Sequence, residues 1–386
     1  MAEDWEHGGF GLYIHWPYCE AKCPYCDFNS HVARTIDHAA WRTAYLSELA
    51  RAASETKGRT LHSVFFGGGT PSLMEPEVVA DIITAIRQHW PVANDLEITL
   101  EANPGSVEAG RFVAFKQAGV NRISIGIQSF QDDKLQRLGR IHGSQEAIKA
   151  VELAKSAGLN SFNTDLMHGL PDQSITDAIS DLKQAIALDP PHLSWYQLTI
   201  EPNTLYYSKP PTLPDDDDLW DIFEQGHALL TAAGYQQYEI SGYSKPGKQC
   251  QHNLNYWRFG DYLGIGCGAH GKISFDDGRI IRTVKVKHPR GYLQADKPYL
   301  SEQIAVADSE RPFEFFMNRF RLLEACPKQD FIDRTGLPLT TIEANIDWAI
   351  EQNYLQDNGD QWQITEHGKL FLNDLLAAFV EDEDEE

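Results

Sequence analysis

Three cysteines near the start of the chain have a spacing that can bind an iron–sulfur cluster. Cys19, Cys23 and Cys26 form a C-x3-C-x2-C pattern directly after an apolar stretch. Three thiolates at this spacing can hold three irons of a [4Fe-4S] cube, which leaves the fourth iron open to a small molecule. Clusters that only transfer electrons have four cysteine ligands, and ferredoxin motifs are spaced differently. The pattern therefore predicts a cluster that binds a ligand.

The triplet also fits a zinc site completed by His15 or His31, or a set of three unrelated buried thiols. Structural zinc usually has four ligands arranged as two pairs, and no second Cys/His pair has the required spacing. The remaining cysteines, Cys250, Cys267 and Cys326, are scattered and are expected to be free thiols in a reducing compartment.

The elements that must position the triplet alternate between strands and amphipathic helices. Strand-like apolar runs occur at Gly11–Trp16, Ser63–Phe66, Leu96–Leu100, Arg122–Ile127, Phe162–Met167 and Leu193–Ile200. Helical patterns lie between them, at about 38–57, 75–89, 106–118, 131–157 and 174–188. This alternation predicts an α/β fold in which a parallel sheet curves into a partial (βα)6 barrel. The cysteine triplet follows the first strand, at the end of the sheet where barrels carry their active sites.

Polar or glycine-rich segments also follow the next four strands. They are the loop Gly67–Ser72, then Glu101, then Gln128 with Arg140 twelve residues later, and then Asp165. Each of these taken alone fits an ordinary turn, loop or helix cap. Because the C-terminal ends of parallel strands meet at one mouth, the four together predict a ligand site next to the cysteines.

The cysteine pattern, with Tyr25 inside it, resembles the signature of the radical S-adenosylmethionine (SAM) family. In that family the open iron binds the amino and carboxylate groups of SAM, whose reductive cleavage gives methionine and a 5′-deoxyadenosyl radical. From Tyr13 to about Ile200 the motifs also follow the order of the oxygen-independent coproporphyrinogen III oxidase branch. The resemblance implies that the residues facing SAM are Tyr13, Tyr25, Gly68, Gly69, Thr70, Glu101, Gln128, Arg140 and Asp165.

The chain departs from the oxidase pattern in two places. The oxidase has another cysteine two residues after its triplet, where this chain has Phe28. The oxidase also has a long extension ahead of the cluster, whereas only eighteen residues precede Cys19 here. These differences are compatible with SAM binding but argue against decarboxylation of coproporphyrinogen.

A second motif is the H-N-x-x-Y-W box at His252–Trp257. Histidine is a usual proximal ligand of haem iron, and aromatic rings can lie against a porphyrin. A histidine in an aromatic segment is, taken alone, more often packed or hydrogen-bonded. Within the radical SAM family, however, the box resembles the haem chaperone branch, which also lacks the extra cysteine and the N-terminal cover. That resemblance implies haem ligation by His252, with haem or a porphyrin as ligand and haem-acceptor proteins as partners.

Composition and charge narrow the class of protein. The chain has 386 residues, 42% of them hydrophobic, and a formal net charge of −23. Nucleic-acid binding needs a basic surface, so the acidic balance argues against it. We expect no signal peptide and no membrane span, and therefore a cytoplasmic protein. No feature decides for or against a homodimer or contact with a membrane surface.

The chain is expected to divide into four parts. A radical SAM partial barrel should span 1–205, a family-specific extension with the haem box 206–305, a small α+β domain 306–380 and an acidic tail 381–386. A linker at 210–214 should lead into a helix near 216–233. Helices expected at 319–324, 339–351 and 366–379, with a hairpin across Asn358-Gly359, resemble a winged helix, and Cys326-Pro327 is expected at a helix end.

Two functions fit these observations. The first is a haem chaperone that binds haem and a SAM-ligated [4Fe-4S] cluster and transfers haem to acceptor proteins. The second is a radical SAM coproporphyrinogen III oxidase, in which the cofactor performs the hydrogen-atom abstraction and the protein orients the substrate. We favour the chaperone because of the box at His252 and the missing cysteine at Phe28. No catalytic residue is assigned, and the sequence leaves open whether the chain is an enzyme.

Overall fold

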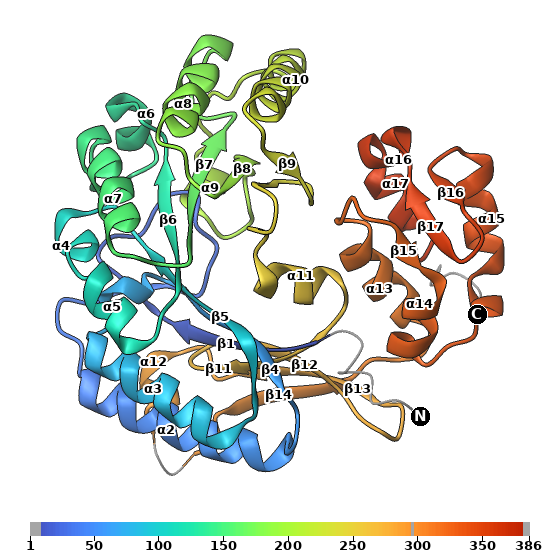
Figure 1. Ribbon diagram of the computed structural model, residues 1–386, viewed down its shortest axis with the longest axis horizontal. Coiled ribbons are helices and arrows are strands. Elements are labelled where there is room, and N and C mark those ends of the chain that lie inside the picture. The colour runs from blue at the N-terminus through green and yellow to red at the C-terminus, as the bar shows by residue number, and fades with distance from the viewer. Residues whose placement is uncertain (1–8, 295–296, 381–386) are drawn as a thin grey trace.

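One mixed sheet of twelve strands forms the centre of the fold in the computed structural model, which describes residues 9–294 and 297–380 (Figure 1). Its parallel part consists, in spatial order, of β11 (Asp261–Ile265), β1 (Phe10–Trp16), β4 (Leu61–Gly68), β5 (Val92–Ala102), β6 (Arg122–Gln128), β7 (Ser161–His168) and β8 (His192–Gln197). Antiparallel strands extend both edges: β14 (Leu300–Ala305), β13 (Ile280–Lys285) and β12 (His270–Ser274) beyond β11, and β10 (Gly242–Ser244) and β9 (Gln236–Gln237) beyond β8. The six strands predicted from the sequence are all present, so the predicted α/β class with a curved sheet is confirmed.

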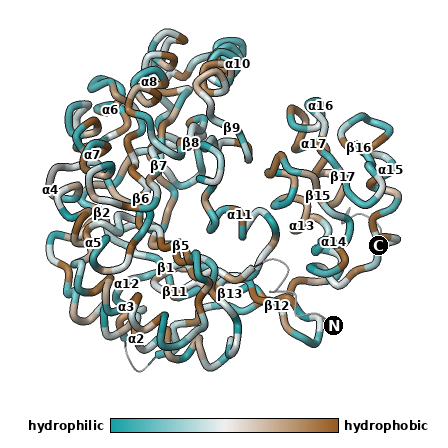
Figure 2. Tube along the Cα trace, viewed as in Figure 1, coloured by the Kyte–Doolittle hydropathy of each residue, from teal (hydrophilic) through white to brown (hydrophobic). Residues whose placement is uncertain are grey.

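Helices cover the outer face of the curved sheet (Figure 1). They are α2 (His38–Glu55), α3 (Pro76–His89), α4 (Ser106–Ala109), α5 (Phe112–Ala118), α6 (Asp132–Arg137), α7 (Ser144–Ser156) and α8 (Ile175–Ala187). Figure 2 shows hydrophobic stretches along β5 and β6, with hydrophilic and hydrophobic residues mixed along the outer helices. None of the helices in the described part of the chain is long and apolar enough to cross a membrane.

The alternation of side chains along each strand explains which residues reach the inside of the barrel. In β5, Ile98 and Leu100 are fully buried in the core beneath the helices, so Glu97, Thr99 and Glu101 share the opposite, inner face. The strand register then aligns the inner residues of neighbouring strands. Glu101 of β5 pairs with Ser124 of β6, and Ser124 pairs with Asn163 of β7. The inner face therefore carries polar rows that end at the mouth of the barrel.

Two predicted helices are interrupted. The helix expected at 106–118 is divided into α4 and α5, and the one expected at 131–157 into α6 and α7. Between α6 and α7, Gly139 has φ +66, which ends the first helix, and Gly143 is the extended N-cap residue of α7. The intervening turn places Arg140 at the mouth of the barrel, where it reaches Cys23. The spacing of apolar residues did not reveal this break, because α6 and α7 each have an apolar face at helical spacing.

The region after β8 returns to the barrel before the last domain begins. It contains α9 (Leu205–Ser208), α10 (Asp216–Ala232), α11 (Gln251–Trp257) and α12 (Pro289–Tyr292). The expected helix near 216–233 is α10, whose first turn is capped by Asp215. The haem box forms α11, and two short strands in the cysteine loop, β2 (Tyr18–Cys19) and β3 (His31–Val32), pair with each other.

The C-terminal domain has its own core and a small sheet. Its elements are α13 (Arg311–Arg319), β15 (Cys326–Pro327), α14 (Lys328–Thr335), a 3-10 turn (Leu339–Thr341), α15 (Glu343–Glu351), β16 (Leu355–Asp357), β17 (Gln361–Ile364), α16 (Glu366–Leu370) and α17 (Leu372–Ala377). The predicted hairpin is formed by β16 and β17. The helix expected at 366–379 is divided at Phe371, and the acidic tail at 381–386 lies outside the described residues.

The prediction of a helix at 319–324 is wrong. This segment instead forms hydrogen bonds with Tyr238 and Arg258, which lie in the region between β8 and the C-terminal domain. Leu323 donates its backbone N–H to the carbonyl of Tyr238 at 3.1 Å. Glu324 forms two bonds of 2.8 Å with the guanidinium of Arg258. Cys326-Pro327 does lie at a helix end, as expected, because Pro327 is the N-cap residue of α14; the two residues also form β15 and pair with β17. Contacts between distant segments thus outweigh the local helical pattern.

Candidate functional site

The cysteine triplet lies in the loop between β1 and α2, and Asn29 ties this loop to the rest of the fold. The Asn29 side chain donates to the carbonyl of Cys267 at 3.0 Å, and its own carbonyl bonds His15 Nε2 at 3.0 Å. All three cysteines of the triplet are half-buried. Burial raises the pKa of Cys19 and of Cys26. Coordination by iron would offset that cost because it stabilises the thiolate form.

A cavity of about 260 Å³ lies next to the triplet at the C-terminal ends of the strands. It is lined by all three cysteines and by eight of the nine residues predicted to face SAM: Tyr25, Gly68, Gly69, Thr70, Glu101, Gln128, Arg140 and Asp165. The remaining one, Tyr13, lies on β1, and its hydroxyl bonds His15 Nδ1 at 3.0 Å. The fold therefore gathers strand ends that are far apart in the sequence around one space.

Two glycines form part of the cavity wall. Their backbones leave space on the cavity side and pack closely against other residues on the far side. Gly68 has φ +108, and a Cβ built there would lie 2.5 Å from the ring of His15. A Cβ at Gly69 would lie 2.5 Å from the carbonyl oxygen of Tyr18, next to the first cysteine. Only glycine fits either position, because larger residues would displace His15 or the cysteine loop. The loop is thus a backbone wall that a ligand can approach closely.

Two half-buried carboxyl groups, Glu101 on β5 and Asp165 on β7, face the cavity. Burial, together with the charge of Asp165, raises the pKa of Glu101 to about 8. Glu101 Oε2 accepts a 3.2 Å bond from the backbone N–H of Gly68. Burial also raises the pKa of Asp165, which accepts bonds from Ser124 Oγ at 3.0 Å and Asn163 Nδ2 at 2.7 Å. Carboxyl groups held in this way can accept bonds from hydroxyl groups such as those of a ribose.

Arg140 connects the cysteine loop to the strand ends. Its Nη1 donates to Cys23 Sγ at 3.6 Å, and its Nη2 donates to Asn103 Oδ1 at 2.6 Å and to the carbonyl of Gly126 at 2.8 Å. The planar guanidinium is thereby fixed with its fork at the cavity wall. Such a group is suited to bind a carboxylate.

Gln128 has an unusual backbone conformation. Its φ is +70, and the β6–β7 register shifts between Gly126 and Gln128, which marks a bulge. Bulges near functional sites redirect side chains. Here the Gln128 side chain accepts a 2.8 Å bond from the hydroxyl of Tyr196 and lines the cavity.

Sequence reasoning missed five polar residues of this cavity wall as candidate ligand-binding groups: Lys22 and Ser30 in the cysteine loop, and Asn103, Ser124 and Tyr196. The last three lie on or just after predicted strands, which is the signal that could have identified them. Asn103 also donates to Thr70 Oγ1 at 3.2 Å, so it joins two strand ends. Phe28, at the position of the oxidase's extra cysteine, is 60% exposed and lines the same cavity.

Both histidines considered for a zinc site are placed elsewhere. His15 is 5% exposed, and both of its ring nitrogens are bonded within the protein, to Tyr13 and Asn29. His31 packs edge-on against the ring of His288. Within residues 9–294 and 297–380, no group of three His, Cys, Asp or Glu side chains is arranged for a single metal ion. The triplet instead surrounds one side of the cavity.

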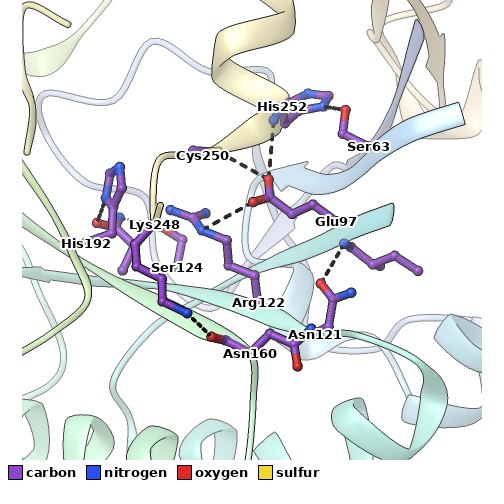
Figure 3. Close-up of polar contacts among 12 residues, drawn as sticks. Ser63, Glu97, Asn121, Arg122, Ser124, Asn160, His192, Lys248, Cys250 and His252 are labelled. Carbon is purple, nitrogen blue, oxygen red and sulfur yellow. Dashed lines mark hydrogen bonds and ion pairs between the residues drawn. The ribbon is translucent and has the colours of Figure 1, made fainter. Parts of the chain in front are cut away.

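His252 lies inside the protein at the start of α11 (Figure 3). It is 1% exposed and packs between the rings of Phe65, 4.8 Å away, and Tyr256, 4.6 Å away. Its Nδ1 bonds Ser63 Oγ at 3.0 Å, whereas the buried Nε2 has no partner among the described residues. Burial, reinforced by the charge of Arg122, lowers the pKa of His252 to about 3, so the imidazole is neutral.

Glu97 holds the beginning of α11 against the barrel (Figure 3). Its Oε1 accepts the backbone N–H of His252 at 3.2 Å and the thiol of Cys250 at 3.5 Å, and its Oε2 lies 3.9 Å from Arg122 Nε. Cys250, Cys267 and Cys326 are all free and buried. Burial raises the pKa of each of these thiols to about 12.

Comparison with known protein families supports the family resemblance that the motifs indicate. Residues 13–184 match the model of the radical SAM superfamily, and residues 306–371 match the HemN C-terminal domain. Among solved structures, the chain is similar to coproporphyrinogen III oxidase (HemN) from Escherichia coli, with a TM-score of 0.80 and 22% identity over 96% of this chain and 89% of that one. At this identity the likeness shows a shared fold.

Relatives of higher identity are found among curated sequences. The chain is 62% identical to the "Heme chaperone HemW" of Escherichia coli (strain K12), covering 96% of this chain and 97% of the relative. It is 32% identical to the protein of the same name from Bacillus subtilis (strain 168), covering 95% of this chain and 98% of the relative. Both similarities extend over nearly the whole chain.

Proposed function

This chain belongs to the HemW family of radical SAM proteins, and we propose that it is a haem chaperone that carries a SAM-ligated [4Fe-4S] cluster and passes haem to acceptor proteins. The observation that carries the proposal is the 62% identity with a heme chaperone over 96% of the chain. The arrangement of the cavity agrees with it, because the three cysteines and eight predicted SAM-facing residues line one space.

The residues at the cavity fit a cluster with SAM. Cys19, Cys23 and Cys26 would hold three irons, and the glycine wall leaves room beside them. When bound, the cluster supplies an iron that can coordinate SAM and an electron for it. The protein contributes position: Arg140 and the half-buried carboxyl of Glu101 are both fixed by hydrogen bonds before any ligand arrives. Cleavage of SAM is not part of the proposal, and no residue is assigned a catalytic role.

We infer that His252 binds haem. Its burial means that α11 has to move before an iron can reach the imidazole. A neutral imidazole that carries its proton on Nδ1 and donates it to Ser63 Oγ has at Nε2 the lone pair that an iron needs. At 1% exposure, however, that nitrogen cannot meet a porphyrin until α11 moves away from Phe65. The contacts of Glu97 to the start of α11 would have to break in that step. Haem binding at the box is therefore expected to be slow.

Phe28 favours the chaperone over the oxidase. Its side chain lies on the wall of the cavity, where it offers an apolar surface and no thiol. A cytoplasmic location, haem-acceptor partners and the absence of nucleic-acid binding belong to the same proposal. They are supported by the free cysteines, by the names of the relatives and by the net charge of −23.

An anaerobic haem titration with the full chain tests this function. We expect stoichiometric binding in the Soret region, followed by transfer of haem to an apo-haem protein such as apomyoglobin. His252→Ala should weaken binding at least tenfold, whereas the control His168→Ala, which removes another buried imidazole with an unbonded nitrogen, should not. A wild-type protein that binds no haem would refute the chaperone function. Haem binding that is the same in both variants would remove His252 from the proposal.

A further inference from the structure

An apolar groove of about 870 Å³ lies between α10 and β9 on one side and the C-terminal domain on the other. Figure 1 shows α10 and β9 facing α16 and α17 across this space. Nine of its seventeen lining residues are apolar or aromatic, among them Trp220, Phe223, Tyr235, Ile240, Leu323 and Leu370, and the others are polar or charged. The groove is separate from the cluster cavity, with which it shares no lining residue.

One face of α10 forms the first wall. Trp220, Phe223, His227 and Thr231 are spaced by three or four residues and therefore lie on the same side of the helix. The rings are in contact along this face: the centroids of Trp220 and Phe223 are 5.9 Å apart, and Phe223 stacks on His227 with centroids 6.1 Å apart. An aromatic stripe on a helix usually packs into a core, but Trp220 is 44% exposed.

The imidazole in this stripe lines the groove and is held by a hydrogen bond. His227 Nδ1 bonds the hydroxyl of Tyr243 at 3.0 Å, and Tyr243 is fully buried. When Nδ1 is the donor in this bond, Nε2 keeps the lone pair that a metal ligand needs. Histidines that bind metals commonly have their second nitrogen held by a hydrogen bond in this way, which sets the tautomer and the ring orientation.

Apolar side chains are accessible on both walls. Leu370 of the C-terminal domain is 57% exposed, and Ile240, which follows β9 on the first side, is 40% exposed. At the rim, Lys369 Nζ pairs with Glu366 Oε1 at 2.6 Å. An ammonium group at the edge of an apolar groove can bind the carboxylate of a ligand. The present partner of Lys369 is the exposed carboxylate of Glu366, which a ligand carboxylate could replace.

We propose that this groove is the site where haem docks and from which it is exchanged, with His227 Nε2 as the iron ligand and Lys369 at the propionate edge. The inference rests on the proposed function, which requires a haem site that solvent and an acceptor protein can reach. His252, at 1% exposure, is reached only after α11 moves, so the groove would be the site of first docking, ahead of the slow binding at His252. The groove volume lies within the range of about 300 to 1,000 Å³ that is typical of ligand sites. Its aromatic walls suit a flat, apolar ring, and these walls come from two domains, whose separation would release the ligand.

Rapid mixing of ferric haem with the full-length protein, followed in the Soret band, tests the site. The variants are His227→Ala, which removes the ligand, and Leu370→Glu, which places a charge in the wall and keeps the histidine. His367→Ala is the matched control, because His367 is an exposed histidine of the C-terminal domain that does not line the groove. Unfolding curves establish that each variant is folded.

We expect a fast, concentration-dependent phase in the wild type and in His367→Ala. His227→Ala and Leu370→Glu should slow it or weaken its affinity at least tenfold, and added imidazole should restore the Soret position in His227→Ala. Rates and affinities within twofold of wild type in both variants would overturn the proposal while leaving the chaperone function intact. Unchanged haem binding with a change in self-association of Leu370→Glu would overturn it too, and would identify a protein-docking face. A wild type without haem binding would instead refute the proposed function itself.

Discussion

Replacing Gly68 by alanine should disturb the cluster cavity by a calculable amount. A new Cβ would lie 2.5 Å from the His15 ring, which is itself bonded to Tyr13 and Asn29. Gly58 offers a matched control because it also has a positive φ, +83, but nothing lies within 4 Å of its Cβ position. Both substitutions carry the backbone cost of a left-handed alanine, about 1–3 kcal/mol. The difference between them isolates the steric overlap.

The overlap should cost about 1–3 kcal/mol more at Gly68, the usual range for overpacking a filled site. If His15 moves to relieve it, its bond to the Asn29 carbonyl is lost, and the cysteine loop loses one of its attachments. SAM affinity should then fall by roughly tenfold to a hundredfold, since each factor of ten corresponds to about 1.4 kcal/mol.

Urea denaturation of the two variants measures the first effect, and equilibrium dialysis of SAM with anaerobically reconstituted protein measures the second. Gly58→Ala should lose stability but bind SAM like the wild type. Equal stability of the two variants within about 0.5 kcal/mol, together with unchanged SAM binding by Gly68→Ala, would refute the idea that the glycine wall and His15 are packed against each other.

Other parts of the structure give three more predictions. Cys19→Ala should abolish the [4Fe-4S] absorbance of reconstituted protein, whereas Cys326→Ala, in the core of the other domain, should retain it; equal loss in both would contradict the three-ligand assignment. Arg140→Lys should keep the cluster but weaken SAM binding about tenfold in dialysis, because an ammonium cannot reproduce the guanidinium fork. Asp261→Asn should cost about 3–5 kcal/mol in urea denaturation at pH 7, since it leaves the buried Lys272 charge without its carboxylate, 3.0 Å away. Burial alone would raise the pKa of Asp261, but its cationic neighbours hold that pKa below the usual value. The wild type should therefore lose this stabilisation only as the pH falls below about 4. The variant, which has no carboxylate at this position, should not show that loss.

The six parallel strands of the barrel and the gathering of the site could be predicted because both depend on local patterns. Alternating apolar runs identify strands such as β5, and the chain direction of parallel strands places Glu101 and Asp165 at the same mouth. Where local pattern and long-range contact disagreed, prediction failed. The segment at 319–324 has a helical period, yet its bonds to Tyr238 and Arg258 determine its conformation.

The residue types and their spacing determined that this protein has three cysteines for a cluster, a glycine-rich wall and a histidine in an aromatic box. Only the tertiary structure decided how accessible each of them is. Exposure depends on what packs from elsewhere in the chain: α11 is held by Glu97, so His252 is enclosed, whereas Trp220 on α10 stays 44% exposed at the edge of its groove. The sequence pattern specifies which side chains share one face of a helix or strand. Whether that face is buried depends on which other elements pack against it.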